Sequence, residues 1–151
     1  MQSLYTHPQI KSFINIAHGE GFGLPIFDAA AAGLPIITIG WSGQKDFLYK
    51  DGKEMFVPVE YNLKPVQQQA VWPGVIEAES KWAFPNQASY KRAIREMKKN
   101  YSNYKERALE LKDWINSTFT EESQYQQFVE GVWGSPPPEL GEVETEVIEY
   151  E

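Results

Sequence analysis

The stretch His18-Gly-Glu-Gly-Phe-Gly-Leu-Pro-Ile-Phe-Asp28 places three glycines and two carboxylates between an apolar segment and an alanine-rich one. The apolar run at residues 13–17 predicts a short buried strand. Residues 24–32 predict a helix, because Pro25 suits a first turn and Gly33 suits a left-handed end. Glycines let the intervening turn approach a ligand closely, and the N–H groups at a helix start attract phosphate or sugar oxygens. The stretch therefore predicts a ligand site at the end of a strand.

The segments that follow extend this unit into an α/β fold. Residues 34–39 predict a second apolar strand, and strand, helix, strand at this spacing indicates a parallel pair with a right-handed crossover. Residues 40–43 then form a second turn at the same edge of the sheet, and residues 54–61 predict a third strand. We interpret residues 62–86, which lack a clear period, as an ordered loop with at most short elements.

The last third of the chain is predicted to be helical. Apolar residues recur at helical spacing over residues 90–101 and 104–115, and Thr120 begins a third helix, with aromatic side chains at expected core positions. The first of these helices carries a basic patch of Lys91, Arg92, Arg95, Lys98 and Lys99. We interpret this patch as a solvated face rather than a nucleic-acid site, because the body of the chain is near neutral.

Composition and charge limit the possible classes of protein. The chain has 151 residues, 42% of them hydrophobic and 14% aromatic, which suits one folded domain over residues 1–133. The net charge is −7, and six glutamates without any basic residue lie in residues 134–151. We therefore predict that residues 134–151 are a solvated acidic tail, with binding to a basic partner as the alternative.

The same composition argues against several kinds of site and location. With no cysteine and two histidines, the chain offers no disulfide, and we expect no metal site. No apolar stretch is long enough to span a bilayer, and no signal peptide is visible. We therefore predict a cytoplasmic protein without a membrane span.

The two carboxylates beside the glycine turn suggest the chemistry of the ligand. Glu20 follows the first strand and Asp28 lies about one turn into the helix, so both can face one crevice. Ionised carboxylates only accept hydrogen bonds, which suits sugar or ribose hydroxyls, whereas backbone N–H groups suit phosphate oxygens. Together they describe a site for a nucleotide sugar. The alternative is that both carboxylates merely cap the helix.

The segment Glu20-Gly-Phe-Gly-Leu-Pro-Ile-Phe-Asp28, with the following Ala29-Ala-Ala-Ala-Gly-Leu-Pro-Ile-Ile37, resembles the donor-site signature of retaining GT-B glycosyltransferases of family 4. That signature is an acidic residue, seven intervening residues and a second acidic residue. The resemblance continues into Trp41-Ser-Gly43 and Asp46, and Trp82 to Tyr90 resembles the end of the donor domain. It covers roughly residues 8–133. It implies part of a Rossmann-like C-terminal domain, with a short parallel sheet flanked by helices and a helical last third.

The resemblance also implies roles for individual residues. Glu20 would be the catalytic residue that accepts hydrogen bonds from the donor sugar, and Asp28 would bind the ribose hydroxyls. The backbone of residues 21–24 would hold the sugar and the diphosphate. The implied substrate-binding residues are His18, Gly21, Phe22, Gly23, Leu24, Asp28, Trp41 and Gly43. For His18, a ring bonded to the backbone is an equal alternative. The nucleotide-diphosphate sugar is the implied substrate, and no metal or other cofactor is implied.

The chain departs from the family pattern in two respects. Asp28 stands where glutamate is usual, which shortens the reach to a ribose. The family has two Rossmann-like domains, so the resemblance implies that the acceptor domain and the diphosphate-clamping basic residues belong to a partner chain or a longer parent. No Arg or Lys near residues 21–24 replaces that clamp in the sequence. We therefore expect no transfer by this chain alone. The alternative is a non-catalytic sugar-nucleotide-binding or protein-interaction module.

Overall fold

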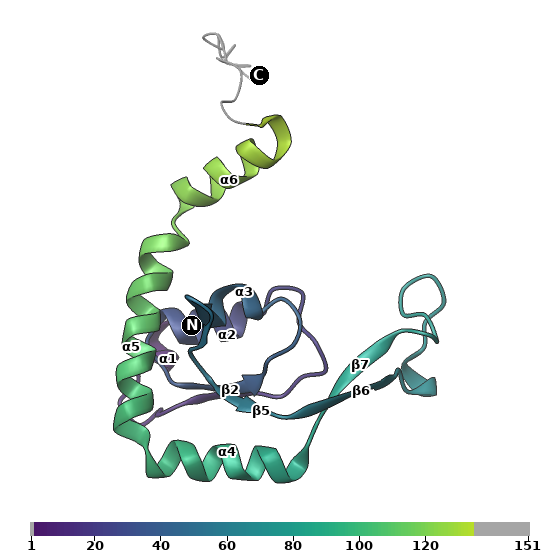
Figure 1. The fold of residues 1–151 in the computed structure, drawn as a ribbon, viewed down its shortest axis with the longest axis horizontal. Helices are drawn as coiled ribbons and strands as arrows, with labels where there is room; N and C mark the ends of the chain where they lie inside the picture. Colours follow the sequence, from purple (N-terminus) through teal and green to yellow (C-terminus); the bar gives the residue numbers. More distant parts are fainter. Residues whose placement is uncertain (1, 135–151) are drawn as a thin grey trace, which may run out of the picture. The chain divides into compact units, whose positions relative to one another are not determined.

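The computed structural model describes residues 2–134, which divide into two compact units at Ser117 and Thr118. The first unit is built on a three-stranded parallel sheet in the order β1-β2-β5 (Figure 1). Its register pairs Ile14 with Ile37 and Thr38 with Pro58. The strands are β1 (Phe13–Asn15), β2 (Ile36–Ile39) and β5 (Val57–Val59). This confirms a partial Rossmann-like fold.

Helices cover both faces of the sheet. Helix α2 (Leu24–Ala31) lies on one side and α4 (Gln87–Lys99) on the other (Figure 1). All four residues of β2 are buried, since the central strand has a neighbour on each edge and a helix over each face. The cluster beneath α4 consists of Ile37, Ile39, Val57, Val59, Ala83, Ala93 and Met97. The predicted βαβ unit is confirmed, with strands shorter than expected.

Helix α5 (Tyr101–Thr118) packs against the end of α2. The Lys105 ammonium donates to the Gly33 carbonyl over 2.7 Å, and Gly33 has the left-handed φ of 79° that its position at a helix end predicts. Burial, then the charges of Lys112 and Lys11, lower the pKa of Lys105. The unit also contains four short elements: α1 (Gln2–Tyr5), α3 (Lys45–Leu48), β3 (Tyr49–Lys50) and β4 (Lys53–Glu54).

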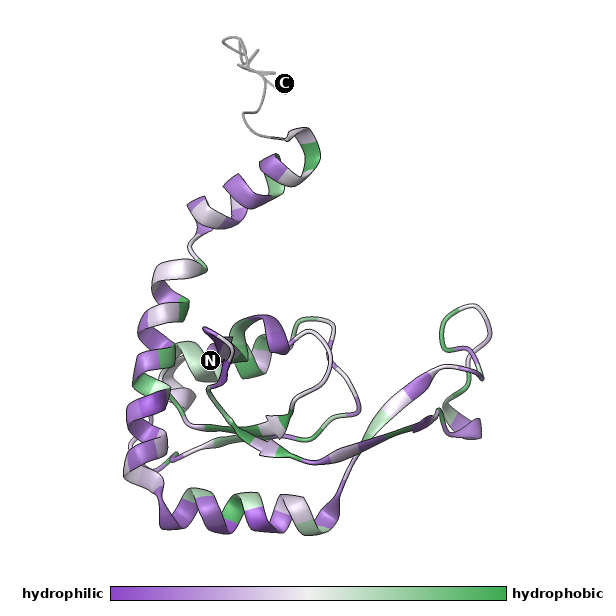
Figure 2. Ribbon diagram, viewed as in Figure 1, coloured by the Kyte–Doolittle hydropathy of each residue, from purple (hydrophilic) through white to green (hydrophobic). Residues whose placement is uncertain are grey.

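The prediction of an ordered loop with at most short elements over residues 62–86 is wrong, because most of a β-hairpin lies in this segment. Strands β6 (Tyr61–Pro65) and β7 (Lys81–Pro85) form an antiparallel hairpin that extends away from the sheet (Figure 1). Its connection contains a 3₁₀ helix, η1 (Gln68–Ala70), and hydrophobic stretches (Figure 2). Trp82 and Phe84 alternate with smaller or charged residues, which is the period of a strand. The connection separates β6 from β7 in the sequence, so the residue pattern of one strand does not indicate that it pairs with the other.

The second unit contains α6 (Glu121–Trp133), whose predicted N-cap is confirmed because the Thr120 side chain accepts from Ser123 N. The expectation that its aromatic residues occupy core positions is wrong. No residue of α6 is buried, and Tyr125 and Phe128 are 63% and 69% exposed. The helical spacing of apolar residues predicts an apolar stripe but not what packs against it. The predicted tail, residues 134–151, lies outside the described residues except for Gly134. None of the described helices is long and apolar enough to cross a membrane.

Candidate functional site

The loops that follow β1 and β2 are joined at the carboxyl end of the sheet. Ser42 Oγ donates to the Glu20 carbonyl over 2.6 Å, and Gly43 N donates to the same oxygen over 3.2 Å. A Cβ on Gly43 would lie 1.8 Å from the Gly21 carbonyl oxygen, so only glycine fits there. Ser42 has a φ of 72°, a conformation that non-glycine residues adopt only when their surroundings hold them there. The second loop thus fixes the backbone of the first.

The Glu20 carboxylate is half-buried and oriented from the strand below it. Asn15 Nδ2 donates to Glu20 Oε1 over 2.9 Å, while Asn15 Oδ1 accepts from Ala17 N over 2.8 Å. No described residue donates to Glu20 Oε2. One oxygen therefore holds the carboxylate in place, and the other stays available as an acceptor for a ligand.

Glu20 lines a cavity of about 510 Å³ at this edge of the sheet. Three segments form its walls: residues 18–21, residues 41–42 and residues 81–82. The cavity thus brings together four residues that the sequence predicts for the site, namely His18, Glu20, Gly21 and Trp41. It adds four that the sequence did not assign to the site: Gly19, Ser42, Lys81 and Trp82.

His18 attaches β7 to this cavity. Its carbonyl accepts from Ala83 N over 3.1 Å, and its Nδ1 donates to the Ala83 carbonyl over 2.8 Å. Its ring stacks on Trp82, with centroids 5.2 Å apart and planes 12° apart. The alternative for His18, a ring bonded to the backbone, is therefore observed, and the residue also lines the cavity; its role in substrate binding stays a prediction. The hairpin is a fixed wall of the cavity.

The other predicted residues lie outside this cavity. Phe22 packs its ring on Phe27 and Phe47, which anchors the glycine turn to the core. Gly23 is the N-cap of α2 and has a left-handed φ of 91°, while Leu24 is 65% exposed. Within the described residues, none of the backbone N–H groups of residues 21–24 donates a hydrogen bond. These groups offer donors at the start of a helix, beside the cavity.

Asp28 is exposed on α2, and no described residue donates a hydrogen bond to its carboxylate. It does not line the cavity that contains Glu20. A ligand that contacts both carboxylates must therefore extend beyond this cavity.

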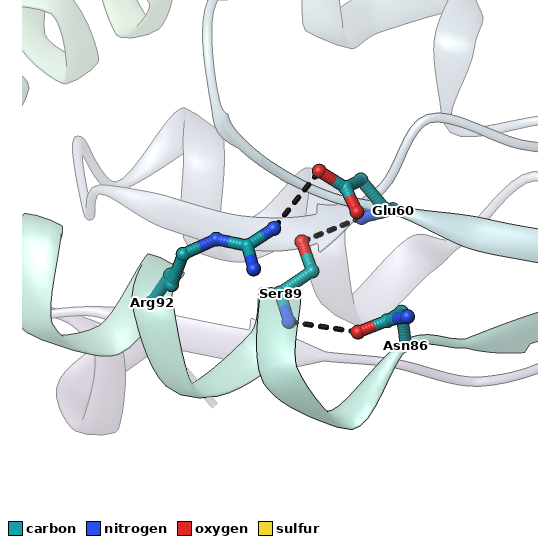
Figure 3. Close-up of polar contacts among 4 residues, drawn as sticks. All are labelled: Glu60, Asn86, Ser89 and Arg92. Carbon is teal, nitrogen blue, oxygen red and sulfur yellow. Dashed lines mark hydrogen bonds and ion pairs between the residues drawn. The ribbon is translucent and has the colours of Figure 1, made fainter.

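A larger cavity, about 920 Å³, lies beside β5 and α4, but its carboxylates are engaged. Figure 3 shows how Glu60 is held: Arg92 pairs with its carboxylate at 2.9 Å and Ser89 Oγ accepts from its backbone N–H. Asn86 caps α4 through Ser89 N in the same junction. At the other wall, burial and a hydrogen bond to Glu54 raise the pKa of Tyr49 to about 12. We place the candidate site at the smaller cavity, because it contains Glu20 together with three other residues that the sequence predicts for the site.

A sequence model described as "Family 4 Glycosyltransferase in conflict systems" matches residues 11–128, which is most of the chain. The chain belongs to this family. The matched region of this family 4 glycosyltransferase begins just before β1 and includes both loops of the cavity and the whole hairpin. Parallel comparisons found no match among curated proteins or solved structures.

Sequence reasoning missed Lys81 and Trp82 as wall residues of this glycosyltransferase domain. The signal that was present is the strand-like alternation of Trp82 and Phe84. No local pattern could bring them to Glu20, because β7 reaches it through the non-local pairing of His18 with Ala83. Among the described residues, no three His, Asp or Glu side chains group as metal ligands. The absence of a metal requirement stays a prediction.

Proposed function

We propose that this chain binds a nucleotide-diphosphate sugar and serves as the donor-binding part of a retaining glycosyltransferase. The observation that carries the proposal is the oriented carboxylate of Glu20, which keeps one free acceptor oxygen inside a cavity. Sugar hydroxyls are donors that suit it. The unpaired N–H groups of residues 21–24 and the start of α2 suit the diphosphate. Asp28 then meets the ribose, while Trp41 and Gly43 shape the edge of the site.

In this proposal the protein contributes position and charge stabilisation rather than a nucleophile. Backbone N–H groups stabilise the charge that develops on the departing diphosphate. The acceptor, held by another domain or chain, attacks from the face that the diphosphate leaves, which retains the anomeric configuration. We therefore expect donor binding by this chain without transfer.

Ligand-observed NMR tests the proposal with UDP-glucose, GDP-mannose, ADP-glucose and their free nucleotides. We expect one donor to bind selectively, with a dissociation constant of about 1 mM, since only half of a cleft is present. Binding by none of them at millimolar concentration, with a folded sample, would contradict the proposal. That result would favour the alternative of a protein-interaction module.

The role of Asp28 makes a separate prediction. Replacing Asp28 with Asn removes the anionic acceptor, so we expect about fivefold weaker binding of the preferred nucleotide, the effect of one exposed charge-assisted hydrogen bond. The measurement is the dissociation constant for the ribonucleotide and for its 2′,3′-dideoxy analogue. The analogue should bind the variant and the unmodified chain equally. Asp46→Asn, the same change in the first turn of α3, is the matched control.

A further inference from the structure

The β6–β7 hairpin contributes Lys81 to the wall of the Glu20 cavity, where no other lysine or arginine of the described residues lies. Lys81 is exposed at the start of β7 and lines the same cavity as Glu20. No described carboxylate forms an ion pair with its ammonium, although Lys50 and Arg92 elsewhere are both paired. An unpaired cation at a cavity wall favours an anionic ligand group.

The position of Lys81 is fixed at its base. The next two residues of β7 bind His18, through the stacking of Trp82 and the two hydrogen bonds of Ala83. His18 lies two residues before Glu20, so the hairpin is bonded to the same loop that carries the Glu20 carboxylate. The lysine therefore projects from a wall that cannot swing away without breaking these contacts, which lowers the entropy cost of engaging a ligand.

We propose that Lys81 binds the phosphate to which the donor sugar is attached, and so supplies the cation that the glycine turn itself lacks. This inference rests on the proposed donor site. If Glu20 accepts from the sugar hydroxyls, the phosphate bonded to that sugar is the part of the ligand that lies nearest to the shared cavity. The second phosphate and the ribose lie farther along, toward α2 and Asp28. Lys81 then discriminates between a nucleoside diphosphate and a nucleoside monophosphate.

The test is a ligand series on the Lys81→Ala variant: a nucleoside, its monophosphate, its diphosphate and its diphosphate sugar. We use the uridine, guanosine and adenosine series in turn. For the series that binds, we expect Lys81→Ala to raise the dissociation constants of the diphosphate and the diphosphate sugar about five- to tenfold. The nucleoside and the monophosphate should bind as before. Lys81→Arg should retain most of the diphosphate affinity.

Lys64→Ala is the matched control, because it removes the same charge from the facing strand. Lys64 pairs with Trp82 in the hairpin and its ammonium lies 5.9 Å from the Phe84 ring, outside the cavity wall. The dissociation constants of the Lys64→Ala variant should equal those of the unmodified chain. Thermal denaturation shows whether Lys64→Ala and Lys81→Ala stay folded. The inference is overturned if Lys81→Ala weakens the binding of all four ligands equally, or if it weakens the binding of none of them.

The same series separates this inference from the proposed function. If Glu20→Gln leaves sugar-diphosphate affinity unchanged while Lys81→Ala weakens binding of the diphosphate, the proposed sugar site fails and only the contact of Lys81 with the terminal phosphate of a diphosphate is supported. If Glu20→Gln weakens only the sugar diphosphate while Lys81→Ala changes nothing, the function stands and the inference fails. Failure of every ligand to bind the unmodified, folded chain overturns both.

Discussion

Glu20→Gln is expected to lower the affinity for the preferred nucleotide-diphosphate sugar by about 2 kcal/mol, or roughly thirtyfold in the dissociation constant. The glutamine oxygen can still accept from Asn15 Nδ2, as Glu20 Oε1 does now. The amide NH₂ then faces the ligand, so a donor replaces the acceptor that the sugar hydroxyls need. The shape and packing of the side chain are kept.

The measurement compares the nucleotide-diphosphate sugar with the free nucleoside diphosphate on the same variant. The free diphosphate should bind Glu20→Gln as it binds the unmodified chain, because it lacks the sugar. Glu60→Gln, at the end of β5, makes the same chemical change in the neighbouring cavity and should alter neither ligand. Equal affinity of the sugar donor for Glu20→Gln and for the unmodified chain would mean that Glu20 does not bind the sugar.

Local pattern predicted the part of the fold whose contacts are close in sequence. The apolar run before the glycine turn, Pro25 near the helix start and Gly33 at its end sufficed for β1, α2 and β2. The hairpin was missed because its contacts are distant in sequence. Its two strands pair across an intervening loop, and the residue pattern of neither strand indicates which segment it pairs with. The exposed apolar side of α6 was also missed, because periodicity indicates an apolar stripe but not what covers it.

The residues of the candidate site also divide into those that the sequence predicts and those that it does not. His18, Glu20, Gly21 and Trp41 lie in two strand-end turns that a parallel sheet must bring together, so the sequence alone predicts their proximity. Lys81 and Trp82 enter through a hydrogen-bonded junction at Ala83 that no spacing rule encodes. Lys81, the basic residue to which our inference assigns a phosphate, thus lies in the segment that was predicted to be an ordered loop.

Gly43→Ala is expected to damage both the stability of the first unit and its donor site. The added Cβ would lie 1.8 Å from the Gly21 carbonyl oxygen and 2.7 Å from its carbonyl carbon. Neither is the end of a flexible side chain, so the two loops must move apart. That movement breaks the bond from Gly43 N to the Glu20 carbonyl and displaces the Glu20 carboxylate. We expect the free energy of unfolding to fall by about 2–3 kcal/mol, the cost of forced overpacking.

Gly21→Ala is the matched control for this change, on the facing loop. A Cβ on Gly21 meets no atom within 4 Å, so chemical denaturation should give an unfolding free energy close to that of the unmodified chain. Gly43→Ala should lower the denaturation midpoint and also abolish detectable donor binding under conditions where it remains folded. If the two variants proved equally stable, the loops would not be held in contact at Gly43. The rigid strand-end turn on which the position of Glu20 depends would then be absent in solution.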